Sequence, residues 1–307
     1  MKLTNHSALV DLSSRIRDEL QRWRCPIYEA RNKSLHARAA LLNRRRQRAE
    51  VARLRAAPLD GPAHARVLVV IPTYRRPDRL NTAVASALAQ SVEDLAVIVV
   101  DDGGGLPDNL PDDPRLTAVS LSSNSATLGL VRNVGVDLID SEFIAFLDDD
   151  NQWTTDHLST AVGALDSAPA LDAVYTSLRR LHPDGTSLDV LGTPFDRKLL
   201  RRQPFVDANS IVVRRSANPR FSLVPRTKET LPKEDWEYVW RLSRRSQIRH
   251  LPAVTVNYTV NPDSYYTDWQ GPGDPLDADD TGRDVPSPDR VASSAERRDH
   301  QPNGNPL

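Results

Sequence analysis

The sequence predicts an α/β fold in which a mostly parallel, Rossmann-like β-sheet is covered by helices on both faces. From residue 66 onward, short apolar runs alternate with stretches whose apolar residues recur at helical spacing. These runs are continuously apolar rather than alternating, as in strands that are buried on both faces. The 307 residues are about twice a typical domain of ~150, so one large domain with appendages or two domains can be accommodated.

The predicted elements follow one another in a regular order. A strand at 66–72 precedes a helix with one apolar face, formed by Leu80, Val84, Ala87 and Leu88. Next come strands at 95–100 and 116–121, a helix at 130–139 and a strand at 143–147. The remaining elements are a helix at 156–167, two strands around a turn at 182–185, an apolar run at 209–213, a helix at 234–246 and a strand at 253–260. Because ligands of such sheets bind beyond the carboxyl ends of the strands, the residues after those ends are the functional candidates.

The two ends of the chain differ from this middle part in charge. Residues 1–60 carry 14 Lys and Arg against 6 Asp and Glu, whereas residues 268–307 carry 4 against 9, within a net charge of −1. We therefore expect a basic helical N-terminal extension over 1–60 and a globular domain over 65–265. The stretch 268–307, which has almost no apolar content, is expected to be a disordered acidic tail.

The extension contains two predicted helices. The first is expected to end or bend at Pro26 and carries one apolar stripe, made of Leu9, Leu12, Ile16, Leu20, Trp23 and Ile27. The second, at 29–56, is rich in arginine and only weakly amphipathic. Three roles are open for it: packing against the main domain or a second subunit, contact with an anionic membrane surface or acceptor, or a solvated charged helix.

The composition excludes several classes of protein. The single cysteine, Cys25, excludes an internal disulfide, a thiolate zinc site and an iron–sulfur cluster, and it suits a reducing compartment. The seven histidines form no H-E-x-x-H pattern, and no serine lies in a nucleophile-elbow sequence. The opening residues do not read as a signal peptide, and no run of 18 apolar residues occurs. We expect a cytoplasmic protein without a nucleic-acid partner, which residues 1–56 could attach to the inner face of the membrane.

Polar residues follow the first two predicted strands. The first strand runs into Ile71-Pro72-Thr73-Tyr74-Arg75-Arg76-Pro77, which lacks the glycines of a dinucleotide site or a P-loop. Its aromatic ring and guanidiniums could stack on a base and bind phosphate, although an ordinary proline-bounded turn has the same composition. The second strand ends in Asp101-Asp102 before three glycines. These carboxylates could accept hydrogen bonds from a base or a ribose, but Asp-Gly is also common in turns.

Three carboxylates, Asp148, Asp149 and Asp150, follow the apolar strand at 143–147. Adjacent carboxylates at the end of a buried strand repel one another, and a hard divalent cation relieves that repulsion. Mg²⁺ or Mn²⁺ held there could also bridge to a nucleotide diphosphate and stabilise it as a leaving group. The alternative is a solvated acidic loop.

Two further acids, Glu234 and Asp235, fall in the first turn of the predicted helix at 234–246. The helix dipole favours the ionised form there, and a carboxylate with a pKa of about 4 is ionised at neutral pH, as a general base must be. An acidic first turn without a catalytic role is the alternative. Asp235 is our first choice for the base and Glu234 the second.

These features occur together in an order that resembles a known family. The segments IPTYRRPDRL, VIVVDDGG, GLVRNVGVDLIDSEFIAFLDDDNQW and KEDWEYVWRL are similar to motifs of the inverting family 2 glycosyltransferases, which have the GT-A fold. The resemblance covers about residues 66–262. It implies a nucleotide half at about 65–153 and an acceptor half at about 154–265. The chain departs from the family at 218–231, which replaces a glycine-rich segment before the catalytic acid.

The resemblance also implies roles for individual residues. The base is held by Thr73, Tyr74 and Asp102, and the whole nucleotide site comprises Pro72, Thr73, Tyr74, Arg76, Asp102, Arg132, Asp148 and Asp149. Mn²⁺ or Mg²⁺ is expected on Asp150, with Asp148 as a second ligand. Asp235, with Glu234 in reserve, is expected to take the proton of the acceptor.

The implied reaction moves a sugar from a nucleotide-sugar, most simply a UDP-sugar, to an acceptor hydroxyl or amine with inversion. The acceptor class, whether a sugar, a lipid-linked intermediate or a small molecule, stays open, as does a homo-oligomeric state. One alternative is a nucleotidyltransferase on the same type of scaffold. Another is a catalytically silent subunit that binds a nucleotide-sugar.

Overall fold

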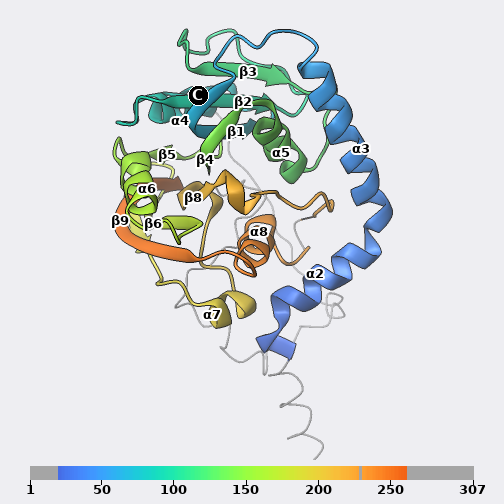
Figure 1. Cartoon of the computed structure of the whole chain (residues 1–307), viewed down its shortest axis with the longest axis vertical. Helices are drawn as coiled ribbons and strands as arrows, with labels where there is room; N and C mark the ends of the chain where they lie inside the picture. The colour runs from blue at the N-terminus through green and yellow to red at the C-terminus, as the bar shows by residue number, and fades with distance from the viewer. Residues whose placement is uncertain (1–19, 228–229, 261–307) are drawn as a thin grey trace, which may run out of the picture. The chain divides into compact units, whose positions relative to one another are not determined.

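One mixed β-sheet organises the described part of this computed structural model, which comprises residues 20–227 and 230–260 (Figure 1). Its strands are β1 (His64–Thr73), β2 (Leu95–Asp101), β3 (Leu116–Ser120), β4 (Asp140–Phe146), β5 (Gln152–Trp153), β6 (Ala173–Leu181), β7 (Ser187–Leu191), β8 (Ile211–Arg214) and β9 (Ile248–Thr259). Within the described residues the order is β3-β2-β1-β4-β8-β6-β9-β5, with β7 paired to β6. Strands β3, β2, β1 and β4 are parallel neighbours, whereas β8 is antiparallel to β4 and β6.

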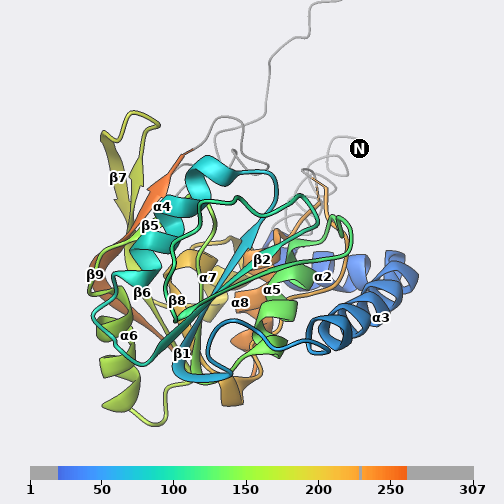
Figure 2. The same ribbon diagram turned by 90° about the horizontal axis from the view of Figure 1, so that it is seen from above.

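Helices cover both faces of this sheet (Figure 2). One face packs against α4 (Pro77–Leu88) and α6 (His157–Asp166), and the other against α5 (Leu128–Leu138) and α8 (Glu234–Leu242). Successive residues of β1 divide between the two layers, since side chains alternate along a strand: Leu68 and Val70 join α5, while Val67, Val69 and Ile71 join α4. The predicted mostly parallel sheet with helices on both faces is therefore confirmed.

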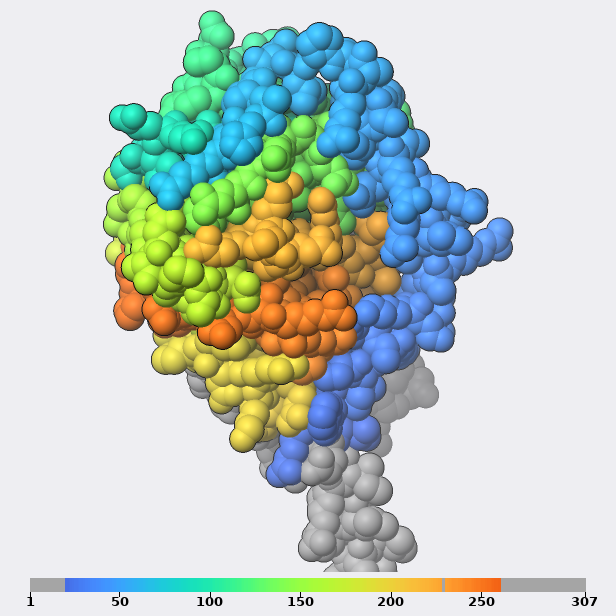
Figure 3. All heavy atoms as spheres, in the orientation of Figure 1, coloured from blue at the N-terminus to red at the C-terminus, as the bar shows by residue number. Residues whose placement is uncertain are grey.

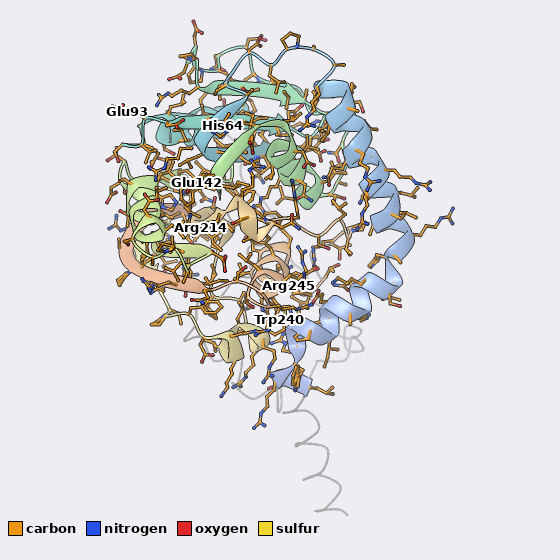
Figure 4. All side chains as sticks on the ribbon, viewed as in Figure 1. His64, Glu93, Glu142, Arg214, Trp240 and Arg245 are labelled. Atoms are coloured by element: carbon orange, nitrogen blue, oxygen red, sulfur yellow. The ribbon has the colours of Figure 1, made fainter. Side chains whose placement is uncertain are left out.

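The parallel and antiparallel parts of the sheet meet at β4 and β8. Phe143 of β4 lies opposite Arg214 of β8, whose guanidinium carbon is 5.1 Å from the centre of the Phe143 ring. Arg214 also pairs with Glu142 at 3.3 Å, and Figure 4 labels both side chains. The carboxyl end of β4, which carries the three adjacent aspartates, thus lies beside both parts of the sheet.

The N-terminal segment differs in detail from the sequence expectation. The predicted helix at 29–56 is two helices, α2 (Arg24–Leu35) and α3 (Ala37–Leu54), separated at His36. Residues 20–22 are helical and a turn at Trp23 separates them from α2, so the expected break lies three residues before Pro26. Pro26 itself lies in the first turn of α2, where its missing N–H removes no helical hydrogen bond. The apolar positions Leu9, Leu12 and Ile16, and the acidic tail 268–307, lie outside the described residues.

Both N-terminal helices pack against the rest of the described chain, which is the first of the three roles considered for this segment. On α3, Gln47 donates to Asp137 of α5 at 2.7 Å, and Asn43 donates to the Leu223 carbonyl at 3.0 Å. On α2, Asn32 donates to the Leu231 carbonyl at 2.8 Å. Helix α2 also contacts α8 and the short helix α7 (Arg197–Arg202). The two helices therefore fix both ends of the segment 223–231, which leads to α8.

Gly135 marks the closest approach of α5 to the sheet. A Cβ atom at this position would lie 2.6 Å from Val70 Cγ1 and 3.2 Å from Val100 Cγ2, whereas a Cβ atom on Gly163 of α6 would have no neighbour within 4 Å. We expect Gly135→Ala to lower the free energy of unfolding by about 1–3 kcal/mol through overpacking. Gly163→Ala should raise it by up to about 1 kcal/mol, because alanine favours a helix. Urea denaturation measures both; equal changes would contradict this packing.

Candidate active site

A cavity of about 520 Å³ lies beyond the carboxyl ends of β1, β2 and β4. Its lining includes Thr73 at the end of β1, Asp102 after β2 and Asp148 after β4. The register pairs Thr73 with Asp101, so the first two strands end at the same level. Of the residues that the sequence singled out, the cavity is lined by Pro72, Thr73, Tyr74, Arg76, Asp102, Asp148, Asp149, Asp150, Glu234 and Asp235. Arg132 is not among the lining residues.

The two aspartates after β2 have different surroundings. Asp101 is fully buried and accepts hydrogen bonds from the Gly104 and Gly105 amides at 3.0 and 2.9 Å, so it holds the turn. Asp102 lines the cavity and accepts a 2.7 Å hydrogen bond from the Ser125 amide, and burial raises the pKa of its carboxyl. Asp102 therefore lies on the cavity wall, whereas Asp101 holds the turn.

Tyr74 offers an aromatic surface at the same end of the cavity. Its side chain is 37% exposed, and the guanidinium carbon of Arg75 is 5.1 Å from the ring centre. Arg75 has φ = 55°, in the left-handed region, which is uncommon for a residue other than glycine. This turn therefore presents an exposed ring that could stack on a planar base.

The three aspartates after β4 make different contacts. Asp149 accepts hydrogen bonds from Thr73 Oγ1 at 2.7 Å and from Arg76 Nη1 at 3.2 Å. Asp150 accepts from Arg76 Nη1 at 2.9 Å. One oxygen of Asp148 accepts from Arg132 and the other from Asn209 Nδ2 at 3.0 Å. Burial, together with the charges of Asp148 and Asp149, raises the pKa of Asp150 to about 6.

Asp150 suits a divalent cation better than its neighbours do. Among residues 20–227 and 230–260, no group of three or more His, Cys, Asp or Glu side chains forms a ready metal site. Mg²⁺ at a nucleotide is usually held by one or two carboxylates, with phosphate oxygens and water completing its shell. Burial is the main cause of the raised pKa of Asp150, and the negative charges of Asp148 and Asp149, which a cation would offset, add to it. Asp148 fits less well, because buried donors already engage both of its oxygens.

Arg132 lies behind the cavity wall and connects three acids. Its side chain is fully buried on α5, and Nη1 donates to Glu234 Oε1 and to Asp235 Oδ1, both at 3.0 Å, while Nη2 donates to Asp148. Burial alone would lower the pKa of Arg132, but the three carboxylates raise it above its usual value. We call these four residues the Arg132 cluster. The family resemblance implies a place at the nucleotide for Arg132, whereas in the structure its side chain contacts the acids of α8.

The environment of Asp235 corrects one expectation from sequence. A first-turn carboxylate was expected to keep a pKa of about 4, because the helix dipole stabilises its charge. Burial, with the charges of Glu234, Asp207 and Asp148, raises the pKa of Asp235 well above its ordinary value despite the nearby Arg132. Desolvation and like charges therefore outweigh the dipole. A raised pKa makes a carboxylate a stronger proton acceptor whenever it is ionised.

Sequence reasoning missed several residues that line the cavity, namely Val206, Asp207, Arg226, Lys233 and Tyr258. Asp207 precedes a short 3₁₀ helix, η1 (Ala208–Ser210), and accepts a 2.8 Å hydrogen bond from the Asn209 amide. Burial and the charge of Asp148 raise the pKa of Asp207 to about 6. The signal for Asp207 was an acid two residues before Asn209-Ser210, a typical capping pattern. Nothing local identifies Tyr258, which β9 brings to the cavity.

The fold and the acid-lined cavity define a GT-A type protein, and comparison with known sequences identifies its family. The sequence model of Glycosyl transferase family 2 matches residues 68–216. The chain belongs to this family.

Individual relatives are similar over part of the chain. The succinoglycan biosynthesis protein ExoW of Rhizobium meliloti (strain 1021) is 39% identical over 105 residues, 32% of this chain and 33% of that protein. The GalNAc(5)-diNAcBac-PP-undecaprenol beta-1,3-glucosyltransferase of Campylobacter jejuni subsp. jejuni serotype O:2 (strain ATCC 700819 / NCTC 11168) is 33% identical over 98 residues, 30% of this chain and 32% of that protein. The chain thus spans about a third of the length of these two curated relatives.

A solved structure has a similar fold. S. aureus TarS 1-349 in complex with UDP-GlcNAc superimposes with a TM-score of 0.52 and 17% sequence identity, covering 67% of this chain and 61% of that one. At this identity the likeness extends to the fold, and it agrees with the GT-A architecture expected from the sequence.

Removing the charge of Arg132 should destabilise the folded protein. Arg132→Met keeps an unbranched side chain but leaves Asp148, Glu234 and Asp235 without their shared cation. We expect a loss of about 3–5 kcal/mol in the free energy of unfolding, as when one partner of a buried ion pair is removed. The control is Arg220→Met, which breaks the partly exposed 2.7 Å pair with Asp137 and should cost about 1 kcal/mol or less. Urea denaturation that gives both variants the same loss would contradict the structural role of Arg132.

Proposed function

We propose that this protein transfers a sugar from a nucleotide-sugar, with a UDP-sugar as the first candidate, to an acceptor hydroxyl or amine. The observation that supports the proposal is that one cavity holds both the base-binding candidates Thr73, Tyr74 and Asp102 and the acid pair Glu234 and Asp235. Membership of the family adds support, as does the UDP-GlcNAc with which TarS was crystallised.

On the donor side, the residues offer complementary contacts to a nucleoside diphosphate. Tyr74 would stack on the base, and Asp102 would accept a hydrogen bond from the base or the ribose. Mn²⁺ or Mg²⁺ would be held by Asp150 and would neutralise charge on the departing diphosphate. Arg76, now between Asp149 and Asp150, would add a second positive charge beside the phosphates once the cation takes its place.

On the acceptor side, Asp235 would take the proton of the attacking group. Asp148 and Asp149 are poor nucleophiles, because Arg132, Asn209 and Thr73 already donate to their oxygens. Asp235 as the base, with the oxygens of Asp148 and Asp149 already engaged, favours one direct displacement, which inverts the anomeric centre; the two carboxylate arrangements of glycoside hydrolases provide the analogy. The acceptor is a sugar, a small molecule or a lipid-linked intermediate. The name of the Campylobacter relative refers to a lipid-linked compound, GalNAc(5)-diNAcBac-PP-undecaprenol.

The direct test is a turnover assay with a panel of UDP-sugars, Mn²⁺ and candidate acceptors. We expect release of UDP and, from an α-linked donor, a β-linked product identified by the anomeric coupling in its proton NMR spectrum. Pyrophosphate released from a nucleoside triphosphate would instead identify a nucleotidyltransferase. Binding of a nucleotide-sugar without hydrolysis or transfer to any acceptor would favour a silent binding subunit.

The cation should be required for tight UDP binding, because three aspartates otherwise face the diphosphate. Calorimetry should give much weaker UDP binding in EDTA than in Mn²⁺, and Asp150→Ala should remove the effect of Mn²⁺. Affinity in Mn²⁺ should fall as the pH drops below about 6, since the pKa of Asp150 lies there and a proton competes with the cation. Asp166→Ala, on α6, is the control. Equal affinity in EDTA and Mn²⁺ would remove the cation from the proposal.

Different substitutions should affect base catalysis and donor binding. Asp235→Asn should lower turnover by about 10²- to 10⁴-fold and change UDP affinity little, because positioned proton transfer contributes a factor of that size. Asp102→Ala should weaken UDP binding instead. Steady-state kinetics and UDP titrations measure the two effects. If Asp235→Asn retains wild-type turnover while Glu234→Gln does not, Glu234 is the base.

A further inference from the structure

The outer surface of the N-terminal helices is strongly basic. Residues 20–56 contain eleven Lys and Arg and only two acids, Glu29 and Glu50. Both acids are buried, at 2% and 4% exposure, and both are paired, Glu29 with Lys33 and Arg244 and Glu50 with Arg53. The surface of this segment therefore carries positive charge without an exposed acid to offset it.

The arginines of α3 divide between its two sides. On the inner side Arg46 donates to Ser123 Oγ at 2.9 Å, and Arg53 donates to the Ser120 carbonyl at 2.6 Å, so these guanidiniums anchor the helix. On the outer side Arg38, Arg45 and Arg48 recur at steps of seven and three and share one stripe with Leu41. No carboxylate among the described residues pairs with Arg38, Arg44, Arg45 or Arg48.

Exposed apolar side chains lie among these arginines. Leu35, Leu41 and Leu42 are 65%, 50% and 53% exposed. Of the nine large hydrophobic side chains exposed in the described part of the chain, six belong to residues 20–42: Leu20, Trp23, Ile27, Leu35, Leu41 and Leu42. Figure 3 shows the side chains of α3 projecting from the right-hand edge of the view, and Figure 4 shows them directed away from the sheet.

We propose that this basic apolar face, formed by Leu35, Arg38, Leu41, Leu42, Arg44, Arg45 and Arg48, binds the surface of an anionic lipid bilayer. Anionic headgroups attract unpaired arginines, and leucines between them gain free energy by entering the interfacial region. Among the helices of the described residues, none has the length and apolarity needed to span a bilayer. The proposed contact is therefore one in which α3 lies along the surface.

Other occupants satisfy only part of this chemistry. In a two-fold dimer formed through this face, the arginines of one copy would meet those of the other, and like charges in contact are costly. A nucleic acid would pair with the arginines through its phosphates but would leave the three leucines exposed. An anionic bilayer provides a partner for both kinds of side chain.

The same helix also contacts the cavity wall. Asn43 of α3 donates to the Leu223 carbonyl at 3.0 Å and contacts the hydroxyl of Thr127, a cavity-lining residue, at 3.2 Å. Membrane attachment through α3 would therefore hold the cavity at a fixed position relative to the bilayer. The inference goes beyond the proposed function, and its test needs no substrate.

The test is sedimentation of the full chain with vesicles of phosphatidylcholine alone or with about one third phosphatidylglycerol. We expect binding to the anionic vesicles only, weakened by salt. Each arginine at a charged surface contributes about fivefold, so Arg44→Gln, Arg45→Gln and Arg48→Gln together should weaken binding by about 100-fold. Leu35→Gln, Leu41→Gln and Leu42→Gln together should also weaken it, although they leave the charge unchanged.

The matched control combines Lys198→Gln, Arg245→Gln and Arg249→Gln. It changes the net charge equally through three exposed residues outside α2 and α3, and it should bind like the wild type. An equal loss in the control would mean non-specific attraction and would overturn the proposal. The proposal would also be overturned if the triple arginine variant or the triple leucine variant bound anionic vesicles as tightly as the wild type does.

A different result would assign the face to a second copy of the chain: the wild type would self-associate without binding vesicles, and the triple arginine variant would not self-associate. UDP affinity of every variant, measured in parallel, checks the fold.

Discussion

The geometry of the candidate site depends on the buried guanidinium of Arg132. It joins α5, the end of β4 and the start of α8 through Asp148, Glu234 and Asp235. Glu234 and Asp235 lie 102 and 103 residues along the chain from Arg132, and without this shared cation the charges of the three acids would repel one another at short range. The proposed donor and acceptor sides of the cavity therefore meet at one side chain, whose replacement would affect both.

In the candidate site the acids outnumber the guanidiniums that pair with them. Burial raises the pKa values of Asp207 and Asp235, and the neighbouring acids, which share one guanidinium, add to the rise. On the proposed donor side Arg76 serves both Asp149 and Asp150, and burial together with the charges of Asp148 and Asp149 raises the pKa of Asp150 as well. Negative charge therefore exceeds positive charge around Asp150 and around Asp235. The surroundings of Asp150 suit a cation beside a diphosphate, and those of Asp235 suit a base that takes a proton.

The N-terminal helices contribute differently through their two sides. Their inner sides bond to Thr127, Leu223 and Leu231, so they brace both ends of the segment that leads to α8. Their outer side carries exposed leucines, and arginines that pair with no carboxylate in the described part of the chain. A segment with a weakly amphipathic sequence can therefore pack on one side and still present a distinctive surface on the other.

The sequence by itself determined the sheet, its covering helices and the cavity-lining residues that follow the strand ends or begin α8. Continuous apolar runs followed by Thr73, Asp102 and Asp148 are local signals, and parallel strands bring their carboxyl ends to one edge. Only the tertiary structure decided that Arg132 faces the acids of α8, that Asp207 and Tyr258 join the cavity, and that the pKa of Asp235 is raised. The reason is physical: burial and charge–charge distances depend on residues remote in sequence, whereas periodicity and strand ends depend on near neighbours.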